Sequence, residues 1–447
     1  MASDVAGYAI NINIIIINDG MMRYEFDPSK KDPLGDDLNV SCHSDDVGDA
    51  NNLHVPATDA GQPGLQKNMA PYFTEKLIAD IKAFDEHDCP GRANWIHPKI
   101  TRGTFHIPKS LPKASASYTR VRLKGKLDYC ASLHHLKSIH NKPNYKFVQG
   151  DICKLDFMRY LFQEENIDVV LHFAAQSHVD LSFWSSLDFT HTNVYGTHVL
   201  INTAHEAGIK LFVHVSTDEV YGGHNNFPDE THKECAKMNP TNPYAASKAA
   251  AECIVLSYWE CFRFPVIITR ANNVYGPHQY PEKVIPKFIS LLERDQKCCI
   301  HGKGDTSRNF LYVSDVSEAF DSILHHGKPG EIYNVGTEFE ISVIDLAKFL
   351  IHKLKGVDVV DDKMAQKYLC FVEDRPFNDQ RYPMDSTKLR ELGWLPKVSW
   401  EEGMDETIKW YTKMANFQSW PLAEEALHPY PLGSNTVRLN DKYNLRH

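Results

Sequence analysis

From about residue 126 onward, apolar and polar positions follow a regular order along the chain. Apolar runs that predict buried strands occupy residues 145–151, 168–175, 210–216 and 265–270. Helical patterns fill the gaps at residues 155–165, 194–207 and 244–261. Such alternation is typical of a parallel sheet with helices on both faces, whose ligands bind at the carboxyl ends of the strands. We therefore predict an α/β, Rossmann-like doubly wound fold.

The pattern divides the chain into four parts. Residues 1–122 are atypical and partly disordered by composition, with a strand predicted at 10–17 and an amphipathic helix at 73–87. Residues 123–275 form a partial dinucleotide-binding domain. Residues 276–431 have a mixed pattern that predicts a smaller α/β substrate lobe, and residues 432–447 a polar tail.

Composition narrows the possible partners. The net charge of -10 disfavours nucleic acid, because phosphate backbones need clustered basic residues. We expect no membrane span, since the run at 10–17 is too short, and no signal peptide, so a cytoplasmic location is favoured. The ten cysteines include no CxxC pair and the 23 histidines no HExxH, so we expect no metal.

Two motifs carry the candidate chemistry. Residues 216–222 read STDEVYG and place a hydroxyl beside two acids. Tyr244 and Lys248 are four residues apart, which is one helical turn. A lysine at that spacing can lower the pKa of a tyrosine and make it a base for an alcohol. The acids offer a second base and an acid for a leaving group.

Together with six further segments, these motifs resemble the nucleotide-sugar branch of the extended short-chain dehydrogenase/reductase family. Within that branch the chain is most similar to the dTDP-glucose 4,6-dehydratases of animals. The matching segments are KLDYCASL (126–133), GDI (150–152), HFAAQSHVDLS (172–182), NVYGT (193–197), STDEVYG (216–222), NPYAASKAAAE (242–252), NNVYGPHQYPEKVIPKFI (272–289) and DRPFNDQRY (374–382).

The resemblance implies a reaction with NAD that converts a nucleotide-glucose to its 4-keto-6-deoxy derivative and water. Tyr244, supported by Lys248, would take the proton of the sugar 4-hydroxyl, and Thr217 would hydrogen-bond the C4 oxygen. Glu219 would remove the C5 proton, and Asp218 would protonate the departing C6 hydroxyl. Opposite tasks for two adjacent carboxyl groups require different pKa values.

The remaining site residues are also carried over by resemblance. The implied NAD contacts are Asp151, Ile152, Ala174, Ala175, Thr192, Tyr244 and Lys248. The implied substrate contacts are Ser177, Asn273, Glu282, Lys283, Arg308 and Arg375. Of these, the two arginines suit a diphosphate, because a guanidinium binds phosphate oxygens in bidentate fashion. A homodimer, paired through a helix bundle that contains 244–261, is implied as well.

One family feature is missing from the sequence. Gly-x-x-Gly-x-x-Gly, which holds the cofactor pyrophosphate between a first strand and its helix, does not occur. Gly125 stands where an acid normally binds the adenosine ribose. The first β-α-β unit is therefore absent or replaced, either genuinely or through an incorrectly joined transcript. The strand at 10–17 could fill the vacant sheet position, an interpretation we favour less, and it brings no phosphate loop.

Three functions remain open. A nucleotide-sugar 4,6-dehydratase is favoured by the complete acid and base set, although this chain could be inactive. A UDP-sugar epimerase or decarboxylase is disfavoured by Asp218 and Glu219. A catalytically silent nucleotide-sugar-binding protein is favoured by the missing glycines.

Overall fold

The computed structural model describes residues 14–18, 120–125, 127–141, 145–223, 231–420 and 422–429. All of them belong to one compact unit of the chain. The helix expected at residues 73–87 and the tail at 432–447 lie outside the described residues.

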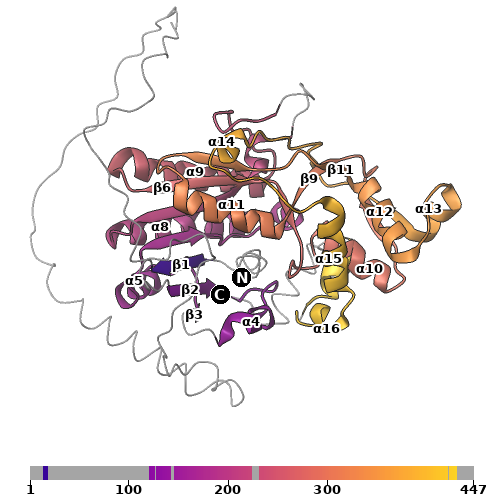
Figure 1. Ribbon diagram of the computed structural model, residues 1–447, viewed down its shortest axis with the longest axis horizontal. Helices are drawn as coiled ribbons and strands as arrows, with labels where there is room; N and C mark the ends of the chain where they lie inside the picture. The colour runs from indigo at the N-terminus through magenta and orange to yellow at the C-terminus, as the bar shows by residue number, and fades with distance from the viewer. Residues whose placement is uncertain are drawn as a thin grey trace, which may run out of the picture. The chain divides into compact units, whose positions relative to one another are not determined.

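A seven-stranded sheet forms the centre of this unit (Figure 1). Its order is β10-β6-β5-β4-β1-β2-β3. The strands are β1 (Ile14–Asn18), β2 (Arg120–Gly125), β3 (Tyr145–Gln149), β4 (Val169–His172), β5 (Leu211–Thr217), β6 (Val266–Ala271) and β10 (Ile332–Val335). All neighbours pair in parallel except at β1. The predicted α/β doubly wound fold is confirmed.

Helices cover both faces of this sheet (Figure 1). On one face, α5 (Leu155–Glu164), α8 (Thr197–Glu206) and α9 (Pro243–Phe262) pack on the strands. Met158, Leu200 and Val255 from these helices share a core with Phe212 of β5. On the other face lies α11 (Val313–His326), whose Phe320 ring is 4.9 Å from that of Phe173. The four residues of β4 are all buried, as a strand covered on both faces requires.

The fifth position of the sheet is held by β1, which runs antiparallel to both neighbours. Ile15 pairs with Leu171 and Ile17 with Val169, so β1 begins at the edge where β4 ends. The less favoured interpretation, that the strand predicted at 10–17 fills the vacant position, is thus the one that the structure has. Its partner β2 was not predicted, because RVRLKG mixes basic and apolar residues and follows a Pro- and Lys-rich stretch.

The second lobe surrounds a separate core. Its main helices are α10 (Val284–Glu293), α12 (Val343–Lys355) and α15 (Trp400–Tyr411), and Phe288, Leu350 and Met404 from them are buried together. Two small sheets complete it, with orders β11-β9-β7 and β12-β8. Their strands are β7 (Asn273–Tyr275), β8 (Cys298–His301), β9 (Ser307–Tyr312), β11 (Glu340–Ser342) and β12 (Leu369–Val372).

Shorter helical segments connect these elements. They are η1 (Leu133–Leu136), α4 (Lys137–His140), α6 (Val179–Trp184), α7 (Ser186–Phe189), the π-helix η2 (Thr190–Gly196), η3 (Asp218–Tyr221), α13 (Asp362–Tyr368), α14 (Thr387–Arg390), α16 (Met414–Phe417) and η4 (Glu425–Leu427). Among all helices of the residues that the structure describes, none is both long enough and apolar enough to cross a bilayer.

A buried ion pair ties α9 to the sheet. The Arg270 guanidinium on β6 donates to the Glu252 carboxylate on α9 through Nε at 3.1 Å and Nη2 at 2.6 Å. Both side chains are nearly inaccessible, at 3% and 0% exposure. Arg270 Nη1 also donates to the Glu234 carbonyl, and the guanidinium lies over the Tyr221 ring. Because each of these two charges is balanced by the other, removal of one charge would leave the other buried without a partner.

We expect Glu252→Gln to lower the free energy of unfolding by about 3–5 kcal/mol, because it leaves Arg270 buried without its counter-charge. Urea unfolding would measure it. As a control, Glu206→Gln removes the exposed partner of Arg159 and should change stability by about 0–1 kcal/mol. Equal, small effects of the two variants would contradict the proposed role of the buried pair.

A second prediction concerns β1. Since residues 15–17 pair with β2 on one side and β4 on the other, their amides should exchange at least about a thousandfold more slowly than in an unstructured peptide. Hydrogen–deuterium exchange read by mass spectrometry checks this, with the peptide that covers β4 as the internal reference. Fast exchange at 15–17 beside a protected β4 would show that β1 is not a central strand.

Candidate functional site

A cavity of about 430 Å³ opens where the carboxyl ends of β4 and β5 face the second lobe. Its walls come from both sides: Ala175 and Ser177 follow β4, Thr217 ends β5, and Phe288 and Arg308 belong to the lobe. This is the edge at which ligands of a doubly wound sheet bind.

At the end of β5 the chain turns into the short helix η3. Thr217 caps this helix, and its hydroxyl accepts a hydrogen bond from the Glu219 amide at 3.3 Å. The turn places Asp218 and Glu219 at the cavity, where both are lining residues. Asn272 donates to the Asp218 carboxylate at 2.8 Å, and Asn242 donates to that of Glu219 at 2.9 Å.

The opposite wall is the first turns of α9. Asn242 caps the helix by accepting from the Ala245 amide at 2.8 Å, and Pro243 occupies its first turn. Tyr244 and Lys248 therefore lie one turn apart on the face that lines the cavity. Lys248 Nζ donates to the Val215 carbonyl of β5 at 2.6 Å.

The two neighbouring carboxyl groups are shifted in their acidity. Burial, and then the Glu219 carboxylate, raise the pKa of Asp218 to about 7, although the Asn272 and Thr217 hydrogen bonds oppose the shift. Burial also raises the pKa of Glu219, and the Asn242 hydrogen bond opposes that rise. A carboxyl group that keeps its proton near neutral pH can act as an acid.

The phenol and the ammonium do not behave as the sequence suggested. Burial raises the pKa of Tyr244, the nearby Glu219 carboxylate adds to the rise, and the Thr217 hydroxyl opposes it. Burial lowers the pKa of Lys248 to about 8. In the protein without ligands the net shift of the Tyr244 pKa is therefore upward, because desolvation of the phenol outweighs the effect expected of Lys248.

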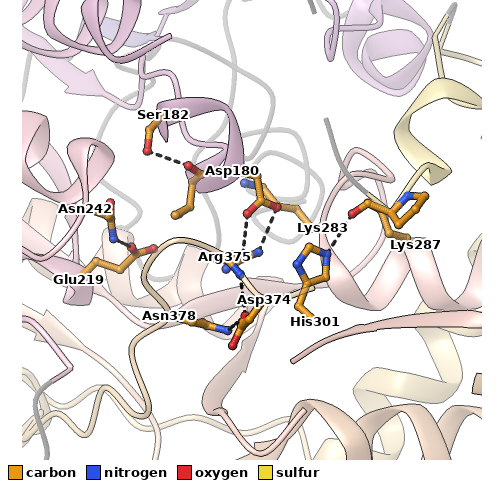
Figure 2. A network of polar contacts seen from close by, with 12 residues as sticks. Asp180, Ser182, Glu219, Asn242, Lys283, Lys287, His301, Asp374, Arg375 and Asn378 are labelled. Carbon is orange, nitrogen blue, oxygen red and sulfur yellow. Dashed lines mark hydrogen bonds and ion pairs between the residues drawn. The ribbon is translucent and has the colours of Figure 1, made fainter. Parts of the chain in front are cut away.

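Basic side chains gather along another part of the cavity wall. They are Lys283, Lys287, His301, Arg308 and Arg375. Figure 2 shows Arg375 between the Glu219–Asn242 pair and the group formed by Lys287 and His301. Such a cluster can bind an anionic group, and the guanidinium groups suit phosphate oxygens.

Asp379 holds the loop that carries Arg375 against the site. Its carboxylate accepts from the Gly223 amide at 3.0 Å and from the Thr241 and Tyr382 hydroxyls, each at 2.5 Å. A Cβ on Gly223 would lie 2.3 Å from the Asp379 Cβ, so this approach requires glycine. Arg308 Nη1 donates to the Asp379 carbonyl at 3.0 Å.

Most of the residues expected at the site meet in this cavity. Those that line it are Ala175, Ser177, Thr217, Asp218, Glu219, Tyr244, Lys248, Asn273, Glu282, Lys283, Arg308 and Arg375. Those that do not line it are Asp151, Ile152, Ala174 and Thr192. Ile152 and Ala174 are buried in the core beneath the helices, and the Asp151 carboxylate accepts from the Cys153 amide at 2.9 Å.

The sequence did not single out several polar residues of the site. Asn242, Asn272 and Asp379 lie inside matching segments, so their polar side chains in those segments were an available signal. Lys287 also lies inside a matching segment, 272–289, and offered the same signal. His301 had no such signal, because only the packing of β8 brings it to the cavity.

Comparisons with known proteins agree with this geometry. The family model described as GDP-mannose 4,6 dehydratase matches residues 106–407. The chain is 58% identical to the mouse (Mus musculus) and 57% to the human (Homo sapiens) dTDP-D-glucose 4,6-dehydratase, over 73% of this chain and 90% and 91% of theirs.

A solved structure is similar as well. A dTDP-glucose 4,6-dehydratase from Streptomyces venezuelae, determined with NAD bound, is 35% identical with a TM-score of 0.61 and covers 66% of this chain and 87% of its own. The resemblance found in the sequence is thus confirmed. With a family match over more than half of its length and close relatives covered almost completely, the chain belongs to the nucleotide-sugar 4,6-dehydratase family.

Proposed function

We propose that the protein acts on a nucleotide-glucose as a 4,6-dehydratase, a hydro-lyase. The observation that carries this is the convergence of Thr217, Asp218 and Glu219 with Tyr244 on one cavity that also holds a basic wall. The reaction needs one protonated and one ionised carboxyl group side by side, and the different environments of Asp218 and Glu219 favour that arrangement. The relatives' names support the same reaction.

In this proposal Tyr244 takes the proton of the sugar 4-hydroxyl after losing its own, and Lys248 is the cation that favours the phenolate. Thr217 hydrogen-bonds the C4 oxygen. Glu219 removes the C5 proton, and Asp218 protonates the C6 hydroxyl as it leaves as water. NAD, when bound, accepts hydride from C4 and returns it to C6. The basic residues Lys283, Lys287, His301, Arg308 and Arg375 hold the diphosphate.

The described residues fit NAD at its reacting end. Tyr244 and Lys248 line the same cavity as Ala175, a small residue that lets a ring approach the backbone. We keep Asp151, Ile152, Ala174 and Thr192 as proposed contacts for the rest of the cofactor. Ser177, Asn273 and Glu282 are the proposed neutral and acidic contacts of the sugar nucleotide.

The pyrophosphate is the part of NAD for which the described residues offer the fewest contacts. In a dinucleotide fold a parallel first strand ends at the ligand edge and leads into a glycine turn and a helix N-terminus. Here β1 runs the other way and ends at the opposite edge. This observation favours a second candidate function, a nucleotide-sugar-binding protein without turnover.

Other features are proposed on the resemblance alone. They are a cytoplasmic homodimer paired through a helix bundle that contains α9, and a division near residue 275 between the cofactor domain and the substrate lobe. An epimerase or decarboxylase remains the alternative within the family, and the neighbouring acids Asp218 and Glu219 argue against it.

The acid role of Asp218 makes a prediction about pH. Because burial raises its pKa from 3.8 to about 7, the folded protein keeps a proton that the unfolded chain releases, and its stability falls as pH rises between these values. Asp218→Asn removes this titration. Relative to wild type, the variant should therefore gain about 3 kcal/mol more stability at pH 8 than at pH 5. Urea unfolding at both pH values measures the gain, and exposed Asp405→Asn is the control. A gain that is the same at both pH values contradicts a raised pKa.

Cofactor content and turnover test the function itself. Full-length protein is denatured, released NAD is quantified, and conversion of dTDP-glucose and UDP-glucose to a product lighter by one water is followed by mass spectrometry. We expect turnover in wild type and a loss of about 10²–10⁴-fold in Tyr244→Phe. If NAD is neither retained nor taken up while the nucleotide sugar still binds, the second candidate function is the correct one.

A further inference from the structure

One ion pair joins the two sides of the cavity. Arg375 lies in the loop after β12, in the second lobe, whereas Asp180 lies on α6, which follows β4 of the large sheet. Arg375 Nε is 2.5 Å from Asp180 Oδ1, and Nη2 donates to Oδ2 at 3.2 Å. Both residues line the cavity, and Figure 2 shows the guanidinium directed at the carboxylate. A contact with both carboxylate oxygens fixes the plane of the guanidinium as well as its position.

The Arg375 backbone is also fixed. The Asp374 carboxylate accepts from the Arg375 amide at 2.8 Å and from Asn378 Nδ2 at 3.0 Å, which closes a tight turn around the arginine. Asn378 Oδ1 in turn accepts from Arg308 Nη2 at 3.1 Å. The two arginines expected to meet a diphosphate are therefore connected through the side chains of Asp374 and Asn378.

Asp180 has basic groups on several sides. Burial alone would raise its pKa, but Arg375 and, after it, His178, His301 and Lys287 lower it. The nearby cations differ in how they are held: Lys287 Nζ donates to the His428 carbonyl at 3.0 Å, and Lys283 Nζ to the Ser177 carbonyl at 2.7 Å. Asp180 is thus a counter-charge inside a basic cluster, and it forms an ion pair with Arg375.

We propose that Asp180 is a positioning residue that holds Arg375 so that the remaining edge of its guanidinium binds the diphosphate of the nucleotide sugar. Nε and one N–H of Nη2 point to Asp180. The two N–H groups of Nη1 and the second N–H of Nη2 form the edge that would bind phosphate oxygens. Arginine loses much rotamer freedom when it binds a ligand, and a pre-formed ion pair removes part of that penalty in advance. The inference rests on the proposed function, because it assumes a diphosphate ligand.

The alternative is that Asp180 competes with the ligand for Arg375. The two cases differ in sign. If Asp180 positions Arg375, its neutralisation weakens binding of a diphosphate, whereas a competing carboxylate would make its neutralisation strengthen that binding. Neither case affects a ligand without phosphate.

Calorimetric titration of the full-length chain separates these outcomes, with thymidine diphosphate and thymidine as probes. We expect Asp180→Asn to weaken thymidine diphosphate about tenfold and to leave thymidine unchanged. Arg375→Ala should weaken the diphosphate at least as much, and Asp180→Asn should add less than twofold in that background, because its effect passes through Arg375. Asp405→Asn, which removes a carboxylate from an ion pair outside the cavity, is the matched control.

Two results would overturn the proposal while leaving the proposed function intact. They are unchanged or tighter diphosphate binding in Asp180→Asn, and an equal loss in the presence and absence of Arg375. If Asp180→Asn does not fold, Arg375→Lys keeps the charge but cannot contact both carboxylate oxygens, and the same tenfold loss is expected. A wild-type protein that binds neither thymidine diphosphate nor uridine diphosphate would refute the proposed function together with this inference.

Discussion

The buried contact between Glu252 and Arg270 holds the two reactive walls of the cavity together. Glu252 belongs to the helix that carries Tyr244 and Lys248, and Arg270 belongs to β6, which pairs along its length with β5. Since β5 ends in Thr217 and leads directly to the two acids, this pair helps to set the distance between the phenol and the acids, together with the hydrogen bonds from Lys248 to Val215 and from Asn242 to Glu219. Local propensity alone would leave α9 free to slide along the strands, whereas a charge with a single buried partner allows one position.

Charge is distributed unevenly within the cavity. Where the sugar would react, burial keeps protons on groups that are ordinarily ionised, as Asp218 shows. Where the phosphates would lie, burial is balanced by opposite charges, and the pKa of Asp180 is lowered. The same desolvation thus serves proton transfer in one region and anion binding in the other, and the presence or absence of nearby cations decides which.

The sequence predicted the elements whose patterns are local. The strands at β4 and β5 and the helix α9 were found with nearly correct bounds, because local apolar and helical patterns define them. The residues proposed to react were identified through their motifs, and the structure brings them to one cavity. The sequence could not predict what depends on packing between distant segments: the pairing of β2, the arrival of His301 at the cavity, or the raised pKa of Tyr244. That last error arose because helical spacing says nothing about how much water reaches a phenol.

The reversal of β1 separates two properties that usually accompany each other in this kind of sheet. Neighbouring strands can complete their backbone hydrogen bonds with a partner of either direction, so the sheet is continuous from β10 to β3. The direction of a strand instead decides at which edge of the sheet the chain leaves it. A reversed strand can therefore keep the sheet continuous while the chain leaves it at the edge opposite to the ligand site. Folding of the chain and binding of a dinucleotide then become independent of each other. A well-folded sample therefore does not show whether NAD is bound.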